Sequence, residues 1–117
     1  MRLTEITYDN AKPIDGYGPG FFRIGGKVIE GAVTVMPSGI ANWGGYDDTA
    51  ALLDMADKVD VIFVGTGAEI AHPPAAFRQT LEAAGLGVEA MASPAACRTY
   101  NVLLSEGRRV ALALFPV

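Results

Sequence analysis

The stretch from Ser93 to Val117 constrains the fold of this chain most strongly, because it contains one complete helix and one complete strand. Ser93 is a preferred N-cap residue, and Pro94 suits the first helical position. Apolar residues then recur at the spacing of one helical face: Ala96, Tyr100, Leu103 and Leu104. Gly107 suits a left-handed helix C-cap. The apolar run from Val110 to Phe115 predicts a buried strand.

Two consecutive strand–helix–strand patterns extend over the C-terminal half of the chain. The segments that carry them are residues 59–64, 75–84, 87–91, 94–106 and 109–115. Apolar, β-branched runs alternate here with helical periodicity, which is typical of α/β proteins with right-handed helical crossovers between parallel strands. Because the connection at residues 106–108 is very short, an antiparallel last strand beside a different neighbour is an open alternative.

The beginning of the chain is rich in turn residues. Asp15-Gly16 and the glycines that follow it break regular structure, so we expect an irregular arm over residues 1–20. Short strands are predicted over residues 21–24 and 27–36, with Gly25-Gly26 as the hairpin turn between them.

The next part of the chain leads from these strands to the first α/β unit. Gly31 is expected to introduce a bulge or a bend into its strand. Residues 40–45 are predicted to add a short strand that contains Trp43. A helix is expected over residues 50–58, because acidic residues precede it and suit a helix N-terminus.

A single domain is expected over residues 1–117, which is near the common domain size. Half of the residues are hydrophobic and 19% are charged, so the chain can form a core. The net charge of -4 argues against a nucleic-acid-binding protein, which normally has a basic face. The single cysteine excludes an internal disulfide, and no apolar run reaches the ~20 residues that span a bilayer.

The N-terminal sequence lacks the basic and apolar regions of a signal peptide, and its composition is not that of a transit peptide. We therefore expect a bacterial cytoplasmic protein. A location in the mitochondrial matrix would require the removal of a presequence.

Gly65-Thr66-Gly67 is the first candidate site. It follows a predicted buried strand, where backbone N–H groups can bind a phosphate or a carboxylate without interference from side chains. The motif lacks the third glycine of a dinucleotide-binding loop and the lysine of a P-loop. A structural turn and a ligand-contacting loop are both open interpretations.

The turn Arg98-Thr99-Tyr100-Asn101 is the second candidate. Four residues with hydrogen-bonding side chains follow each other in one helical turn, and Arg98 and Asn101 flank the apolar seam through Tyr100. Such groups need partners when they are buried. They can join the helix to the Gly65–Gly67 loop, or they can line a pocket, and the sequence leaves both alternatives open.

Catalytic residues, a metal site and a cofactor are not predicted. Cys97 lies in the first helical turn, where a helix dipole can lower the pKa of a thiol, but His72, the only histidine, is remote in sequence. A buried and unreactive thiol is the favoured interpretation. One histidine and one cysteine fall short of the three or four ligands of a zinc site.

Several sequence strings together resemble a known family. They are IDGYGPGFFRIGG from Ile14, Trp43, VGTG from Val64, and SPAACRTYNVLLSEGRRVALALFP from Ser93. The chain resembles, over residues 14–116, the Mth-type domain family of unknown function. That family includes mitochondrial respiratory complex I assembly factor 3 and the adipogenesis-associated Mth-domain protein.

This resemblance implies a three-layer α/β fold around a central mixed β-sheet, with flanking helices and an additional β layer from the N-terminal half. It implies no established enzyme activity and supplies no catalytic residues. It also implies action through protein contacts, because members of the family assist the assembly of a membrane enzyme complex.

We therefore expect a non-enzymatic protein-binding or assembly-factor-like protein, whose partner could be a subunit of a membrane complex. It is not expected to insert into membranes or to bind nucleic acid. The alternatives are a small-molecule or anion binder, which could be an enzyme, and a structural homo-oligomer. The candidate ligand- or partner-binding residues are Trp43, Gly65, Thr66, Gly67, Arg98, Thr99 and Asn101.

Overall fold

The fold is built around a five-stranded mixed sheet in a computed structural model that describes residues 12–117. Its strands, in spatial order, are β5 (Gly39–Asn42), β4 (Val33–Met36), β8 (Val110–Phe115), β6 (Val61–Thr66) and β7 (Gly87–Met91). β6 pairs in parallel with both β8 and β7, whereas β4 pairs antiparallel with β5 and β8. The last strand therefore has one parallel and one antiparallel neighbour, and the predicted central mixed sheet is confirmed.

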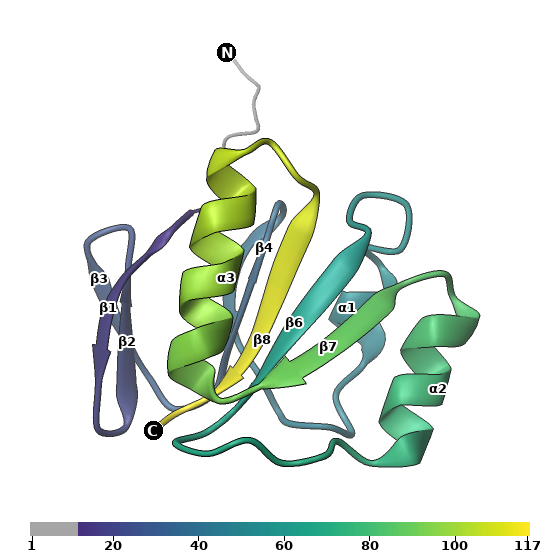
Figure 1. Ribbon diagram of the computed structural model, residues 1–117, viewed down its shortest axis with the longest axis horizontal. Helices are drawn as coiled ribbons and strands as arrows, with labels where there is room; N and C mark the ends of the chain where they lie inside the picture. The colour runs from purple at the N-terminus through teal and green to yellow at the C-terminus, as the bar shows by residue number, and fades with distance from the viewer. Residues whose placement is uncertain (1–11) are drawn as a thin grey trace.

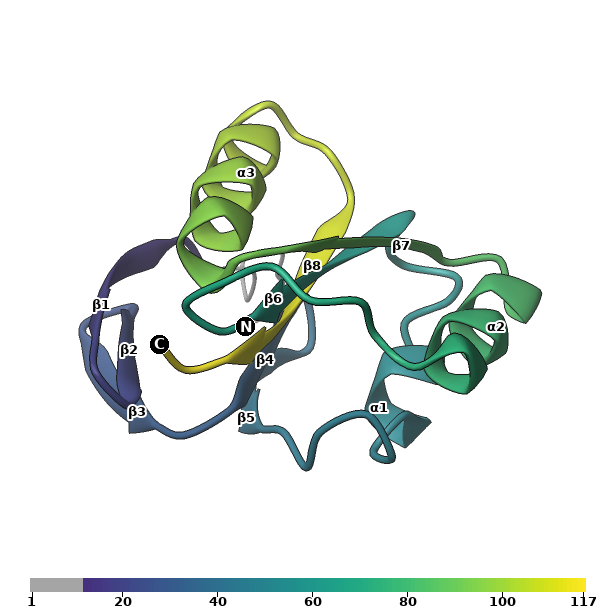
Figure 2. The same ribbon diagram turned by 60° about the horizontal axis from the view of Figure 1, so that its bottom comes forward.

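Two further layers cover this sheet (Figures 1 and 2). An antiparallel sheet of β1 (Ile14–Gly18), β2 (Phe21–Ile24) and β3 (Lys27–Glu30) lies beside α3 (Ser93–Ser105) on one face. On the other face lie α1 (Ala50–Leu53) and α2 (Ala75–Ala83). The α/β class, the flanking helices and the additional β layer from the N-terminal half agree with the prediction.

Alternation along the central strands divides the interior into two cores. In β8, Ala111 and Ala113 face the core beneath α1 and α2, whereas Val110, Leu112 and Leu114 face the core shared by α3 and the three-stranded sheet. Adjacent residues of a strand point to opposite faces, so an unbroken apolar run indicates a strand buried on both sides. β8 is such a strand, as its sequence predicts.

The N-terminal boundary of regular structure differs from the prediction. Residues 14–18 form strand β1 and not an irregular arm, because Ile14 is buried and the strand pairs with β2 through a register that shifts between Ile14 and Gly16. The turn residues therefore mark a bulged strand and its hairpin, not the absence of a strand. The rest of the expected arm, residues 1–11, lies outside the described residues.

Two other predicted elements are shorter than expected. The strand predicted over residues 27–36 is divided at Gly31, whose φ of 81° turns the chain from β3 in one sheet into β4 in the other. The helix predicted over residues 50–58 ends at Leu53, and i to i+3 hydrogen bonds continue it as tight turns. Trp43 follows β5 instead of lying within it.

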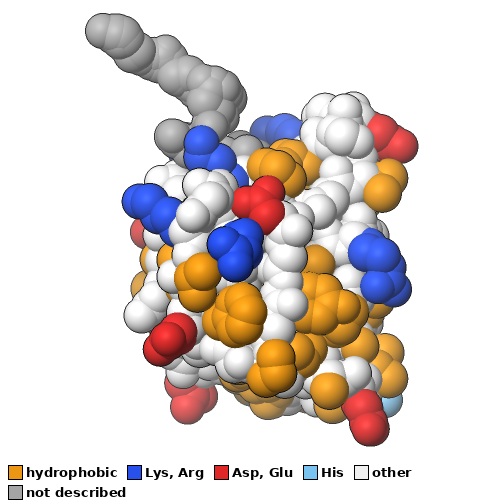
Figure 3. Space-filling model, turned by 90° about the vertical axis from the view of Figure 1, so that its left-hand side faces the viewer, with side chains coloured by type: hydrophobic (Ala, Val, Ile, Leu, Met, Phe, Trp, Pro, Cys, Tyr) orange, Lys and Arg blue, Asp and Glu red, His pale blue; other side chains and the backbone are white. Residues whose placement is uncertain are grey.

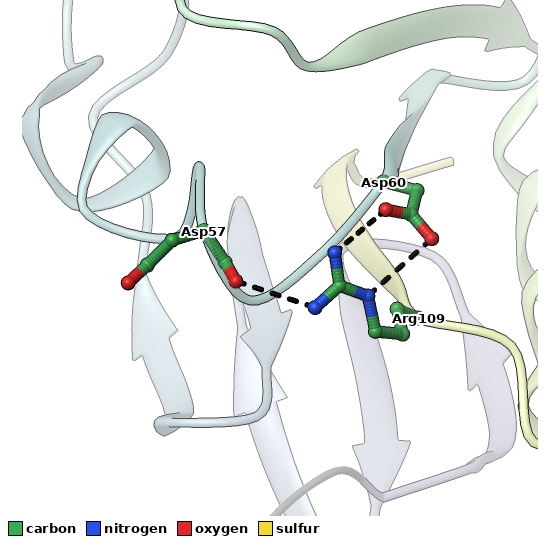
Figure 4. A network of polar contacts seen from close by, with 3 residues as sticks. All are labelled: Asp57, Asp60 and Arg109. Atoms are coloured by element: carbon green, nitrogen blue, oxygen red, sulfur yellow. Dashed lines mark hydrogen bonds and ion pairs between the residues drawn. The ribbon is translucent and has the colours of Figure 1, made fainter.

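The N-terminal ends of β6 and β8 are joined by Asp60 and Arg109 (Figure 4). Arg109 donates from Nη2 to Asp60 Oδ1 at 2.8 Å and from Nη1 to the Asp57 carbonyl at 3.3 Å, while the Asp60 amide donates to the Arg109 carbonyl. The hydrogen bond from Arg109 holds the pKa of the Asp60 carboxyl below its ordinary value. Both side chains are exposed, so the pair contributes little to the stability of the fold.

We predict that Gly65→Ala destabilises the protein by about 1–3 kcal/mol in urea unfolding, because the added methyl group overpacks the interior. A Cβ at Gly65 would lie 2.5 Å from Leu114 Cδ2 and 2.9 Å from Ser93 Cα. Gly16→Ala is the matched control, because no atom lies within 4 Å of its added carbon. Equal unfolding free energies of the two variants would contradict this close approach of α3 to β6.

Candidate functional site

Ser93 is buried where the C-terminal ends of the parallel strands meet α3. Its hydroxyl accepts a hydrogen bond from the Gly67 amide at 2.9 Å and donates one to the Phe115 carbonyl at 2.6 Å. Its own amide donates to the Gly67 carbonyl at 2.7 Å. The prediction that the Ser93 hydroxyl caps its own helix is therefore wrong. Ala92 occupies the N-cap position, and the hydroxyl joins the ends of β6 and β8 instead.

The Gly65–Gly67 turn is held by hydrogen bonds between Thr66 and the backbone of the residues that follow it. Thr66 Oγ1 donates to the Glu69 carbonyl at 2.7 Å and accepts from the Ala71 amide at 3.0 Å. Gly67 has a φ of 106°, a conformation that favours glycine. Because the Gly67 amide is already bound by Ser93, it is not free to bind an anion in this conformation.

Asn101 and Tyr100 join α3 to the three-stranded sheet. The Asn101 amide group pairs with the backbone of Ile14 in both directions, accepting from its N–H at 2.8 Å and donating to its carbonyl at 2.9 Å. The Tyr100 hydroxyl donates to the Lys12 carbonyl at 2.9 Å, and burial raises the pKa of this phenol. Of the two alternatives left open by the sequence, Asn101 thus takes the structural one, but it joins the helix to β1 and not to the Gly65–Gly67 loop.

Arg98 and Thr99 lie on the outward side of the same helix. With Val102 and Leu103 they line a shallow groove of about 440 Å³ on α3. These four residues are at i, i+1, i+4 and i+5, which is one helical face. Among residues 12–117, the guanidinium of Arg98 makes no ion pair. Arg98 therefore offers a positive charge beside apolar side chains.

Trp43 belongs to an aromatic cluster on the opposite side of the central sheet. Its ring packs against those of Phe115 at 4.8 Å, Tyr46 at 5.7 Å and Phe77 at 6.1 Å between centroids. Its Nε1 donates to the Asp48 carbonyl at 3.0 Å, and its side chain is 6% exposed. Trp43 thus fixes the loop between β5 and α1.

Cys97 faces the core between α3 and the three-stranded sheet. Burial raises the pKa of its thiol to about 11, although the neighbouring charge of Arg98 lowers it slightly. The thiolate is the reactive form, so the fold suppresses nucleophilic chemistry at this position. The environment is that of the buried, unreactive thiol favoured by the sequence.

The predicted site residues do not converge on one site. Gly65 and Gly67 meet Ser93, and Thr66 bonds to the backbone of the segment that follows it. Asn101 meets β1, Trp43 lies across the sheet, and only Arg98 and Thr99 share a groove. Val102 was missed, although an apolar residue four positions after Arg98 on the outward helix face is a usable signal. The sequence predicted a helix-capping role for Ser93. Its observed role depends on its three-dimensional position next to Gly67, which the sequence does not reveal.

Within residues 12–117, no group of three or more His, Cys, Asp or Glu side chains is arranged to hold a metal ion. No helix within the same residues has the length and apolarity needed to cross a membrane.

The family model for a protein of unknown function (DUF498/DUF598) matches residues 14–115. The chain belongs to this family. A protein of Rhodobacter capsulatus, described as uncharacterised, is 50% identical over 117 residues. The match covers 100% of this chain and 94% of the relative.

Another relative is the NADH dehydrogenase [ubiquinone] 1 alpha subcomplex assembly factor 3 of Danio rerio. It is 33% identical over 110 residues, which are 88% of this chain but only 63% of the length of the relative. The resemblance to the family of this assembly factor is confirmed.

Solved structures of similar proteins share this fold. A protein of Bartonella henselae, described as an outer membrane protein, has a TM-score of 0.84 and 35% identity over 92% of this chain and 97% of its own. A Bordetella pertussis protein, described as a Mth938-like domain, has a TM-score of 0.75 and 30% identity over 99% of this chain and 92% of its own.

Asn101→Ala is predicted to destabilise the protein by about 1–3 kcal/mol, because the N–H and C=O groups of Ile14 lose their partner. Urea unfolding measures the loss. Ser105→Ala is the matched control, since the exposed Ser105 hydroxyl bonds only within its own helix, to Val102. If the two alanine variants unfold at the same urea concentration, Asn101 does not lock β1 to the helix.

The second prediction concerns the Cys97 thiol. With a pKa of about 11, roughly one thiol in a thousand is ionised at pH 8, and the side chain is buried as well. We expect alkylation by iodoacetamide at pH 8 to be at least about 100-fold slower in the folded protein than in urea. Mass spectrometry gives both rates. Rapid alkylation of the folded protein at pH 6 would overturn this assignment and indicate a nucleophile.

Proposed function

We propose that this DUF498/DUF598 protein acts by binding another protein and not by catalysis, in the manner of an assembly factor. The observation that carries the proposal is the outward face of α3, where a groove lined by Val102 and Leu103 lies next to the charge of Arg98. An apolar groove with a charged residue at its edge is typical of a protein-binding surface.

The three-stranded sheet also carries exposed hydrophobic side chains. Among the described residues, four large hydrophobic side chains are strongly exposed, and three of them lie on β1, β3 and α3: Tyr17, Val28 and Val102. Figure 3 shows the side of the molecule formed by that sheet, with hydrophobic side chains gathered over its central and lower part and with lysine and arginine side chains beside them. Exposed apolar area of this kind supports a protein interface.

Charge specifies the chemistry of the partner. Because Arg98 has no counter-ion among residues 12–117, a partner segment with a carboxylate next to an aliphatic or aromatic side chain would complement the groove. Arg98 and Thr99 are the proposed recognition residues. Asn101 would hold the helix in place beneath them, and the Gly65–Gly67 turn and Trp43 would support the fold.

A subunit of NADH dehydrogenase is the proposed partner. The assembly-factor relatives support this choice through their names, although the chain spans only 63% of the Danio rerio protein. We further propose that the protein acts in the bacterial cytoplasm, since a relative that matches 100% of this chain is from the bacterium Rhodobacter capsulatus.

The test uses an affinity-tagged chain and detergent-solubilised membranes of Rhodobacter capsulatus, with NADH dehydrogenase subunits quantified by mass spectrometry. Val102→Glu should reduce their recovery at least about tenfold, because a buried unpaired charge opposes binding. Ile70→Glu is the matched control, since Ile70 is 68% exposed but lies between β6 and α2. Arg98→Ala should weaken recovery as well, with an unfolding free energy within about 0.5 kcal/mol of the parent.

Two results would contradict the proposal. One is recovery of NADH dehydrogenase subunits that does not exceed that of an untagged control. The other is a wild-type protein that sediments as a dimer and that Val102→Glu converts to a monomer, because this face would then bind a second copy of the chain.

A further inference from the structure

A cavity of about 240 Å³ opens on the other side of the molecule, between the start of α2 and the loop that precedes α1. The protein-binding surface proposed above does not include it. Its lining residues include two aromatic side chains and three polar ones: Tyr46, Phe77, Asp47, Thr49 and Thr80. Such a combination of apolar walls and a few convergent polar groups is typical of a binding site.

The aromatic rings form a fixed wall. The rings of Tyr46 and Phe77 lie 4.9 Å apart at an angle of 66°, and Trp43 packs edge-on against Tyr46. Trp43 does not line the cavity, but its bond to the Asp48 carbonyl holds this arrangement in place. Aromatic faces carry negative charge density and attract cations that lie within about 6 Å of the ring.

The polar groups of the cavity are acceptors of hydrogen bonds. Asp47 is exposed and has no ion pair among residues 12–117, and the Thr49 hydroxyl makes no capping bond to α1. The Thr80 hydroxyl donates to the Ala76 carbonyl, so only its lone pairs remain available. A carboxylate and two hydroxyl groups beside aromatic rings match the requirements of a cation that donates hydrogen bonds.

Positive groups near the cavity do not cancel this preference. Arg78 on α2 is already bound to Glu82 and to the Val88 carbonyl. The N-terminus of α2 carries about half a unit of positive charge, which is less than the full negative charge of Asp47. Asp47 is therefore the one charged side chain among the described residues that line the cavity.

We propose that this cavity binds a cationic group, an alkylammonium or a guanidinium, which can belong to a free amine or to a Lys or Arg side chain of another protein. The cation lies against the rings of Tyr46 and Phe77, and Asp47 supplies the opposite charge. This site is independent of the groove on α3, so the loss of either activity leaves the other intact.

Trp43 provides the measurement, because it is the only tryptophan of the chain and contacts Tyr46 directly. Its fluorescence is followed during titration with tetramethylammonium chloride at constant ionic strength, and the amide signals of Tyr46 to Thr49 are followed by NMR in parallel. We expect a saturable change. Two compounds serve as controls: tert-butyl alcohol, which is uncharged, and sodium acetate, whose organic ion is an anion. Neither should produce a saturable change.

Variants separate the contributions of charge and aromaticity. Asp47→Asn keeps the shape but removes the charge, and it should raise the dissociation constant at least about fivefold. Tyr46→Leu should do the same by removing the ring, whereas the matched variant Tyr46→Phe should bind like the parent. Urea unfolding of each variant confirms that it is folded.

The source of the cation is decided by a comparison of n-butylammonium with a short peptide that contains one lysine. If the peptide binds more tightly than n-butylammonium, the ligand is a side chain of a protein. If it binds equally tightly or more weakly, the ligand is a free amine. The proposal is overturned if neither fluorescence nor NMR shows saturation, if the alcohol or acetate binds as well as the ammonium, or if Asp47→Asn binds like the parent.

Discussion

The hydroxyl of Ser93 is the interaction on which the arrangement of the α/β half depends. It binds the Gly67 amide and the Phe115 carbonyl, and so it joins the ends of β6 and β8 to the start of α3. The contact is possible only because Gly65 has no side chain where Ser93 packs. A buried hydroxyl that is fully bonded in this way fixes geometry, since each lost partner would leave a buried polar group unpaired.

The other polar residues of α3 extend this constraint to the three-stranded sheet. Asn101 bonds to both backbone groups of Ile14 as a neighbouring strand would, and Tyr100 holds the carbonyl of Lys12. One helix therefore connects both sheets through side chain–backbone hydrogen bonds. Its inward polar groups are used in folding, and its outward groups, Arg98 and Val102 among them, line the groove to which we propose that a partner binds.

The sequence predicted those parts of the fold that depend on local patterns. The run from Val110 to Phe115 and the helix that starts at Ser93 have strong periodicity and end signals, so both were found. Ile14 was missed as part of a strand because its pairing depends on contacts with β2 and Asn101, which are distant in sequence. The same reason explains why the hydrogen-bond partners of Ser93 and Asn101 differ from those expected from the sequence. Sequence spacing does not encode which loop lies beside a helix.

Hydrogen exchange of two backbone amides tests the central claim that side chains of α3 lock the two sheets together. Gly67 N–H and Ile14 N–H have side-chain acceptors, Ser93 Oγ and Asn101 Oδ1. We expect both amides to exchange as slowly as the paired amides of β6, through global unfolding only. Exchange at the rate of exposed loop amides, while β6 stays protected, would show that α3 does not lock either sheet.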